Sequence, residues 1–240
     1  MPKLAAVPAR FDARSAILEA AQRLFAARGL HDVTMTEVAE AAGVARATVF
    51  NHFGSKHALV DALTAEVLGG YVLLLDSALA DRKTPTPVLV RTLFAWMGRG
   101  IEENERFYRA IFREIAKISQ GLDEGGEAQK VRSAALERLL QLHTRGQARG
   151  ELSRAHPPES LASAFDSLVF GTVTHWLYED HGETLHERML RAADLLLGGI
   201  AVDPGAKYEG PAPVLLSQDV IDARPARRAR ARGRGTRRRT

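Results

Sequence analysis

The chain has 240 residues, with 33 Lys and Arg against 29 Asp and Glu and no cysteine. This length suffices for one large or two small domains with a hydrophobic core. The lack of cysteine excludes disulfides, thiol nucleophiles and thiolate metal sites. The longest stretch without Asp, Glu, Lys or Arg, residues 167–178, is far shorter than the ~20 apolar residues of a membrane-spanning helix. The first ten residues, MPKLAAVPAR, lack the apolar run of a signal peptide, so we expect a soluble cytoplasmic protein without a membrane partner.

Charge is distributed unevenly over three segments of the chain. Residues 1–57 carry seven Lys and Arg against five Asp and Glu, residues 58–222 carry 17 against 24, and residues 223–240 carry nine Arg and no acidic residue. The two ends therefore suit a polyanionic partner, whereas the acidic middle does not. From residue 202 onward the apolar periodicity is lost, and the Arg-, Ala- and Gly-rich composition predicts a disordered tail at 202–240.

Apolar residues recur at helical spacing along most of the chain, and no segment shows the alternation of a strand, so the predicted fold is all-α. The predicted helices span residues 12–28, 35–42, 46–52, 85–103, 105–120, 127–149, 158–180 and 184–197, with a further long helix starting after Ser55. Thr34 and Glu37 have the spacing of a capping box at a helix start. Gly29, Gly43 and the pair Gly198-Gly199 are predicted to end the helices that precede them.

Two short predicted helices, joined by the turn 43–45, follow a longer helix, which is the arrangement of a helix-turn-helix. Gly43 gives the turn its backbone freedom, and Val44 and Val49 are predicted to fill the space between the two helices. Phe50 and Phe53 are expected in the core. The outward face of the second short helix then consists of small and hydrogen-bonding side chains, Arg46, Ala47, Thr48, Asn51 and His52. In the major groove arginine reads guanine and asparagine reads adenine, so this helix is a candidate DNA-recognition helix.

Residues 34–59, TMTEVAEAAGVARATVFNHFGSKHAL, resemble the DNA-binding signature of TetR-type transcriptional regulators, and the similarity extends from about residue 17 to residue 63. The resemblance implies a DNA-binding domain at residues 1–57. It implies phosphate contacts for Thr34, Thr48, His52 and Lys56, and base-reading positions for Thr36, Arg46, Ala47 and Asn51. Two positions depart from the family pattern. Phe50 replaces a usual tyrosine, and Ala45 replaces a serine-like helix cap.

The resemblance also implies that residues 58–201 form a helical domain that binds a small-molecule effector and forms a homodimer. The protein is then expected to be a repressor, not an enzyme and without a cofactor, which the effector releases from a palindromic double-stranded operator. Aromatic and histidine side chains on the predicted helices are candidates for the effector pocket: Trp96, Phe107, Phe112, His143, Phe170, His175 and Trp176. His143 and His175 are the predicted polar anchors. Ordinary core packing is the alternative for every one of these side chains.

The last two predicted helices are expected to form a four-helix interface in the dimer. Two apolar stripes are the candidate interface: Leu161, Phe165, Leu168, Thr172 and Trp176 on one helix, and Leu185, Met189, Ala192 and Leu196 on the other. Packing within one chain is the alternative for both stripes.

Two other functions compete with the regulator. A helical enzyme would use His143 or His175, but the sequence offers no paired carboxylates and no nucleophile motif. A non-specific nucleic-acid-binding protein would act through the Arg-rich tail. His175, His181 and His186 are spaced by six and five residues, which does not place three ligands on one helix face, so no metal site is expected.

Overall fold

The computed structural model describes residues 12–119, 126–179, 182–203 and 209–210. In this part of the chain the regular structure is helical, apart from one isolated bridge between Leu152 and Ala201. The helices are α1 (Ala13–Arg28), α2 (Met35–Ala42), α3 (Arg46–Phe53), α4 (Lys56–Ala80), α5 (Thr86–Glu102), α6 (Glu105–Ser119), α7 (Glu127–Ala148), α8 (Pro158–Tyr178) and α9 (Leu185–Ile200). The predicted all-α class is confirmed.

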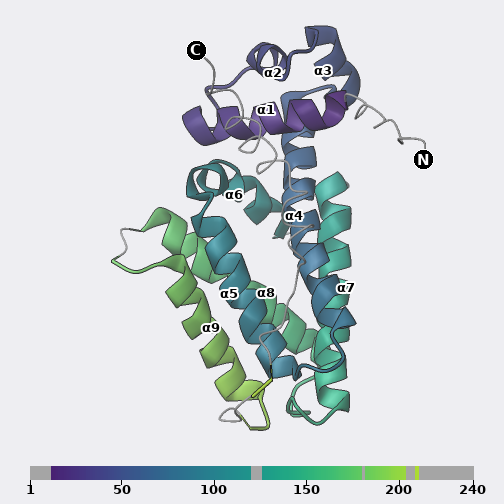
Figure 1. Cartoon of the computed structure of the whole chain (residues 1–240), viewed down its shortest axis with the longest axis vertical. Helices are drawn as coiled ribbons and strands as arrows, with labels where there is room; N and C mark the ends of the chain where they lie inside the picture. The colour runs from purple at the N-terminus through teal and green to yellow at the C-terminus, as the bar shows by residue number, and fades with distance from the viewer. Residues whose placement is uncertain (1–11, 120–125, 180–181, 204–208, 211–240) are drawn as a thin grey trace, which may run out of the picture.

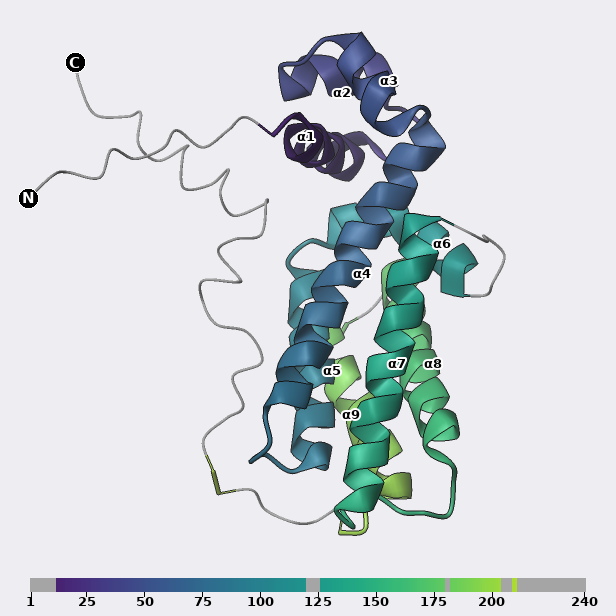
Figure 2. The same cartoon turned by 90° about the vertical axis from the view of Figure 1, so that its right-hand side faces the viewer.

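The helices form a small unit and a larger bundle that share α4. Figures 1 and 2 show α1, α2 and α3 together at one end of the molecule, with α2 and α3 outermost. From this unit α4 runs into the bundle, where α7 packs along it and α5, α8 and α9 complete the body. α6 lies between the bundle and α1, and contacts both. α2 and α3 therefore form the end of the molecule that lies away from the bundle.

Each part of the molecule has its own hydrophobic core, and α4 contributes to both. In the N-terminal unit Ile17 and Phe25 of α1 pack with Leu59 and Leu63 from the first turns of α4. Further along α4, Leu75 belongs to the core of the bundle. Among the described helices α4 alone is long and apolar enough to span a membrane, and half of its most apolar window is buried inside the fold. Burial in two cores accounts for this apolar composition.

The predicted helix boundaries agree with the structure within a few residues, but α9 is longer than predicted. It continues through Gly198 and Gly199 to Ile200. A glycine inside a helix costs only about 1 kcal/mol, and the burial of Leu197 and Ile200 outweighs that cost. The amide of Ser153 then donates to the carbonyl of Ile200 at 2.7 Å. Most of the predicted disordered tail lies outside the described residues.

The apolar stripes predicted to form a dimer interface pack inside the bundle of a single chain. Leu161, Phe165 and Trp176 of α8 are buried in the bundle core, and α9 packs on α5 and α8. On α9 the predicted stripe is buried in full, comprising Leu185, Met189, Ala192 and Leu196. The intramolecular alternative therefore holds for both stripes, with Leu168 and Thr172 half-buried at the margin.

Candidate DNA interface and effector cavity

The turn between α2 and α3 has the predicted geometry of a helix-turn-helix. At the start of α2, the Thr34 amide donates to the Glu37 carboxylate at 2.7 Å and the Glu37 amide donates to the Thr34 hydroxyl at 3.3 Å, which confirms the capping box. Gly43 ends α2 with φ 69° and ψ 32°, a left-handed conformation that glycine adopts without a steric penalty. Behind the turn Val49 is buried, whereas Val44 is only half-buried. Val49 therefore fills most of the space between the two short helices.

The outward face of α3 carries the candidate base-reading side chains. Arg46, Ala47 and Asn51 are exposed, as is His52, while Thr48 is half-buried. Thr36, at the start of α2, is also exposed. The structure therefore brings these predicted residues to the end of the molecule where α2 and α3 lie (Figure 1).

Arg46 lies over the ring of Phe50, with 5.3 Å between the guanidinium carbon and the ring centroid. Phe50 is 37% exposed, so its predicted place in the core is wrong, whereas Phe53 is buried as predicted. The two rings differ because α3 packs its Val49 and Phe53 face on α1 and α4, which turns Phe50 outward. A cation–π contact at an exposed site contributes about 0.5–1 kcal/mol, enough to bias the Arg46 side chain toward one orientation.

Two of the predicted phosphate-contacting side chains already have partners within the chain. The hydroxyl of Thr34 donates to the Glu37 carboxylate at 2.8 Å, and the Lys56 ammonium donates to the His31 carbonyl at 3.3 Å. The pKa of Glu37 is lowered to about 2, mainly by Arg28, which forms an ion pair with it at 2.8 Å. The hydrogen bonds from Thr34 lower this pKa further. Lys56 retains further N–H donors for a phosphate, whereas Thr34 contributes mainly to the helix cap.

The bundle contains a cavity of about 110 Å³ between α4, α5, α6, α7 and α8. This volume is several times what one water molecule needs, so the cavity is more than a packing defect. Of the predicted pocket residues, Trp96, Phe112 and Phe170 line it, and the rings of Phe112 and Phe170 stack with centroids 5.1 Å apart. α4 contributes Tyr71, a lining residue that the sequence analysis did not single out.

The cavity wall is mostly apolar, with one ion pair and the polar atoms of Tyr71, Trp96 and Tyr108 among its lining residues. Arg132 of α7 binds Asp166 of α8 through two hydrogen bonds of 3.1 and 2.7 Å. Both side chains line the cavity and are largely buried, with 13% and 20% of their surface exposed. The hydroxyl oxygen of Tyr71 is buried and has no hydrogen-bond partner among the described residues. The ion pair could not be predicted from the sequence, because Arg132 and Asp166 are 34 residues apart on different helices.

Four predicted pocket residues do not line this cavity. Phe107 and His143 are buried in the bundle core. The Nδ1 of His143 donates to the carbonyl of Leu139 one turn earlier at 2.8 Å, and its ring packs edge-on against Phe165. Burial lowers the pKa of His143, because desolvation penalises the charged imidazolium. His143 is thus a neutral residue of α7 in the bundle core.

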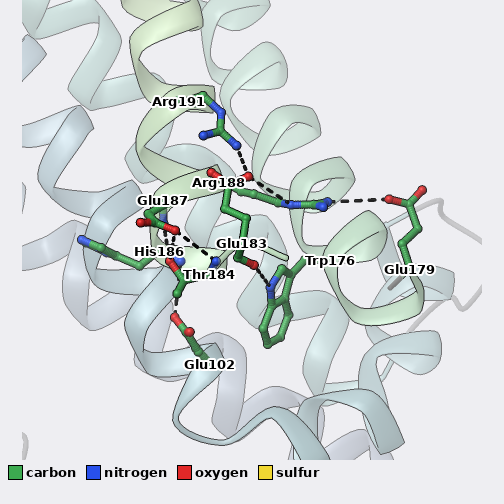
Figure 3. A network of polar contacts seen from close by, with 9 residues as sticks. All are labelled: Glu102, Trp176, Glu179, Glu183, Thr184, His186, Glu187, Arg188 and Arg191. Carbon is green, nitrogen blue, oxygen red and sulfur yellow. Dashed lines mark hydrogen bonds and ion pairs between the residues drawn. The ribbon is translucent and has the colours of Figure 1, made fainter. Parts of the chain in front are cut away.

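Trp176 belongs to a polar network between the end of α8 and the start of α9 (Figure 3), and His175 precedes it on α8. His175 is exposed and contacts Glu179 at 2.8 Å, so the prediction that it is a pocket anchor is wrong. The indole N–H of Trp176 donates to the carbonyl of Glu183 at 3.1 Å, which directs the ring to the turn instead of the cavity. Arg188 extends toward Glu179, as Figure 3 shows, at 3.6 Å. These contacts join the end of α8 to the start of α9.

The described residues contain no cluster of His, Asp and Glu that could hold a metal ion. Of the three histidines considered in the sequence, His186 contacts the carbonyl of Ala95 at 3.1 Å and His175 pairs with Glu179. His181 lies outside the described residues.

The start of α7 joins the cavity to the N-terminal unit. Asp61 of α4 accepts hydrogen bonds from the amides of Glu127 and Ala128, at 2.7 and 3.2 Å. Arg14 of α1 forms an ion pair with Glu127 at 3.1 Å. A Cβ on Gly126 would lie 2.4 Å from the Asp61 carboxylate, so the glycine permits this close approach. α7 therefore contacts α1 and α4 at its first turn and the cavity further along, through Arg132.

Comparison with known proteins agrees with this arrangement. The family model for bacterial regulatory proteins of the tetR family matches residues 17–63. The HTH-type transcriptional regulator SrpR of Pseudomonas putida is 30% identical over 169 residues, which cover 70% of this chain and 75% of SrpR. The chain belongs to the TetR family of transcriptional regulators.

Two further comparisons extend over most of the chain. The HTH-type transcriptional repressor BepR of Brucella suis is 25% identical over 177 residues, covering 71% of this chain and 83% of BepR. The structure of the regulator FadR of Bacillus subtilis in complex with stearoyl-CoA aligns with a TM-score of 0.62 at 19% identity, covering 77% of this chain and 97% of FadR. Nearly the whole fold of FadR is therefore present in this chain.

Proposed function

We propose that this TetR-family regulator is a homodimeric repressor that binds a palindromic operator and is released from it by a small molecule. The observation that carries the proposal is that one helix, α4, contributes both to the DNA-binding unit and to the cavity. The N-terminal turns of α4 belong to the core beneath α3, and its middle, at Val67, Leu68 and Tyr71, lines the cavity. A ligand with different affinity for two positions of α4 shifts the population between them, and so the position of α3.

In this proposal the DNA-binding unit consists of α1, α2, α3 and the first turns of α4. Arg46, Ala47 and Asn51 of α3 read base edges, together with Thr36 of α2. Thr48, His52 and Lys56 contact phosphates, with Thr34 supporting them through its helix cap. The exposure of the α3 face supports these roles, as do the chemical preferences of arginine and asparagine for guanine and adenine.

Dimerisation is proposed through the outer faces of α8 and α9, with a second copy of the chain as the occupant. Gly171, Gly198 and Gly199 lie within these helices, and a Cβ at any of them would meet no described atom within 4 Å. Helical glycines destabilise a helix by about 1 kcal/mol relative to alanine, and packing within this chain does not require them. The absence of side chains at these positions permits close approach of a second chain. Leu195 is 76% exposed on the outer face of α9 and adds apolar surface to it.

Two connections carry the effect of a ligand from the cavity to the DNA-binding unit. α7 lines the cavity through Arg132 and is joined to α1 and α4 through Glu127 and Asp61. α6 lines the cavity through Phe112, and its Ala110 packs against both hydrophobic cores. FadR, which shares the fold, binds stearoyl-CoA, which supports a small-molecule role for this domain.

The remaining parts of the proposal concern activity and location. A cytoplasmic, non-enzymatic role follows from the regulator function. The described positions of His143 and His175 support it, because one is a neutral core residue and the other is an exposed partner of Glu179.

Selection of binding sites from random duplex DNA tests this function. The full chain should enrich one palindromic sequence, and a variant ending at residue 222, without the Arg-rich tail, should enrich the same sequence. Loss of all enrichment in the truncated variant would favour non-specific binding through the tail. Enrichment of no sequence by either protein would contradict the repressor.

A further inference from the structure

The Tyr71 hydroxyl is a buried polar group that the fold leaves unpaired. Its oxygen is buried and has no hydrogen-bond partner among the described residues, while the ring lines the cavity. Leaving a buried hydroxyl unsatisfied is unfavourable, and phenylalanine would fill the same space without that cost. Burial raises the pKa of Tyr71 well above its ordinary value, so the hydroxyl keeps its proton and can donate. Packing alone does not account for a tyrosine here.

The charge of the cavity argues against an ionic ligand. Arg132 and Asp166 are the charged residues of the described lining, and each neutralises the other through two hydrogen bonds. Because this pair is already neutral, an anion or a cation that binds here adds a net charge to a largely buried site. Burying a charge without a partner is strongly unfavourable. The lining therefore favours an uncharged molecule.

Aromatic rings determine the shape of the site. Trp96, Tyr108, Phe112 and Phe170 come from α5, α6 and α8 and line the same cavity as Tyr71. Flat aromatic surfaces pack well against such rings in offset or edge-to-face arrangements. An apolar cavity with few polar groups uses those groups to orient its ligand.

We propose that the effector is an uncharged aromatic molecule with one hydrogen-bond acceptor, which accepts the hydrogen bond of the Tyr71 hydroxyl. This inference rests on the proposed ligand-responsive function. It adds the chemical class of the ligand and the atom that orients it. Binding pairs the hydroxyl that is unpaired in the free protein, and the Arg132–Asp166 ion pair stays intact.

Calorimetry on the full chain with matched probes tests the ligand class. 2-Acetylnaphthalene carries an acceptor, 2-ethylnaphthalene has a similar shape without one, and 2-naphthoate carries a negative charge. 2-Acetylnaphthalene should bind about tenfold more tightly than 2-ethylnaphthalene, the effect of one hydrogen bond, and 2-naphthoate should bind most weakly. Preferred binding of 2-naphthoate or of lauroyl-CoA would overturn the inference in favour of an anionic effector, and equal binding of the two neutral probes would remove the role of the hydroxyl.

The Tyr71→Phe variant separates a ligand role from a structural one. Its melting temperature should rise by about 2–4 °C, because an unpaired polar group is removed, while its affinity for 2-acetylnaphthalene falls about tenfold. Tyr178→Phe, at an exposed tyrosine, is the control and should change neither value. A lower melting temperature for Tyr71→Phe would mean that the hydroxyl has a partner in the free protein, which overturns the inference.

The same measurements distinguish failure of the ligand class from failure of the proposed function. Calorimetry reports on the cavity whether or not the protein binds an operator. If 2-acetylnaphthalene binds as expected but the selected operator complex does not dissociate, the ligand class stands and ligand-controlled repression fails. If another class of molecule releases the operator, repression stands and the ligand class fails.

Discussion

Arg46 and Lys56 differ in the contacts that each makes without DNA. The Arg46 guanidinium lies over the Phe50 ring on the exposed face of α3. Lys56 donates to the His31 carbonyl in the turn before α2. Arg46 can therefore turn toward a base edge with its orientation already biased, whereas Lys56 stays close to the protein surface, where a phosphate would pass.

At the residue scale, the sequence predicts surface chemistry better than pocket chemistry. The exposed face of α3 follows from helical periodicity, because Val49 and Phe53 fix which side is buried. The position of His175 does not follow, because the same periodicity allows a histidine near the end of α8 to face the cavity or the solvent. Phe50 was predicted in the core from its apolar side chain, and the register of α3 places it outside.

Ala45 is the N-cap of α3 and provides no side-chain hydrogen bond, as the sequence predicted. Its φ of −66° and ψ of 146° are extended values that serine adopts readily. Ala45→Ser should stabilise the N-terminal unit by about 0.5–2 kcal/mol, because the hydroxyl accepts a hydrogen bond from a free amide of the first turn. Urea unfolding followed by circular dichroism measures the change.

Ala47→Ser is the matched control, since it introduces the same side chain two residues later, within α3. There a serine cannot cap the helix and slightly lowers helix propensity. Equal changes in unfolding free energy for the two variants would contradict the capping role of position 45.

At the scale of elements, helix type and extent could be predicted, but the faces that meet could not. Capping signals placed α2 within its observed bounds, since capping depends on a few neighbouring residues. The assignment of the α8 and α9 stripes to a dimer interface failed, because an apolar stripe has the same sequence whether it packs on its own chain or on another. Helical glycines carry better information, because the structure shows which of them the chain itself requires. A Cβ added at Gly98 of α5 would lie 3.0 Å from the Cα of His186 in α9, whereas Gly171 and Gly198 face open space.

The proposed dimer predicts that Leu195→Glu produces monomers. Leu195 is 76% exposed, so the substitution leaves the folded monomer intact, but it buries an unpaired carboxylate in the interface. Leu73→Glu, at a leucine of α4 that is 50% exposed, is the control and should remain dimeric. Sedimentation equilibrium measures the oligomeric state of both variants. A dimer of unchanged stability in Leu195→Glu would exclude this face and leave the DNA-binding proposal intact.

At the scale of the whole molecule, α4 connects the two functions. It is part of the N-terminal core at Leu59 and Leu63, lines the cavity at Tyr71, and binds the start of α7 through Asp61. The division at residue 57 in the sequence marks the change in net charge, while the two cores share α4 beyond it. A cavity formed by five helices could not be predicted from one sequence, because its lining depends on how the helices pack on one another.

The most direct test of the account compares DNA binding by Arg46→Ala and Lys56→Ala. Affinities for the selected operator and for a scrambled duplex are measured at several salt concentrations. Arg46→Ala should weaken operator binding by about 1–3 kcal/mol per half-site and leave scrambled DNA nearly unaffected. Lys56→Ala should weaken binding to both duplexes alike and reduce the salt dependence by about one unit per half-site. Equal losses on both duplexes for Arg46→Ala would contradict base reading by α3, and unchanged operator binding in both variants would contradict the placement of α3 in the groove.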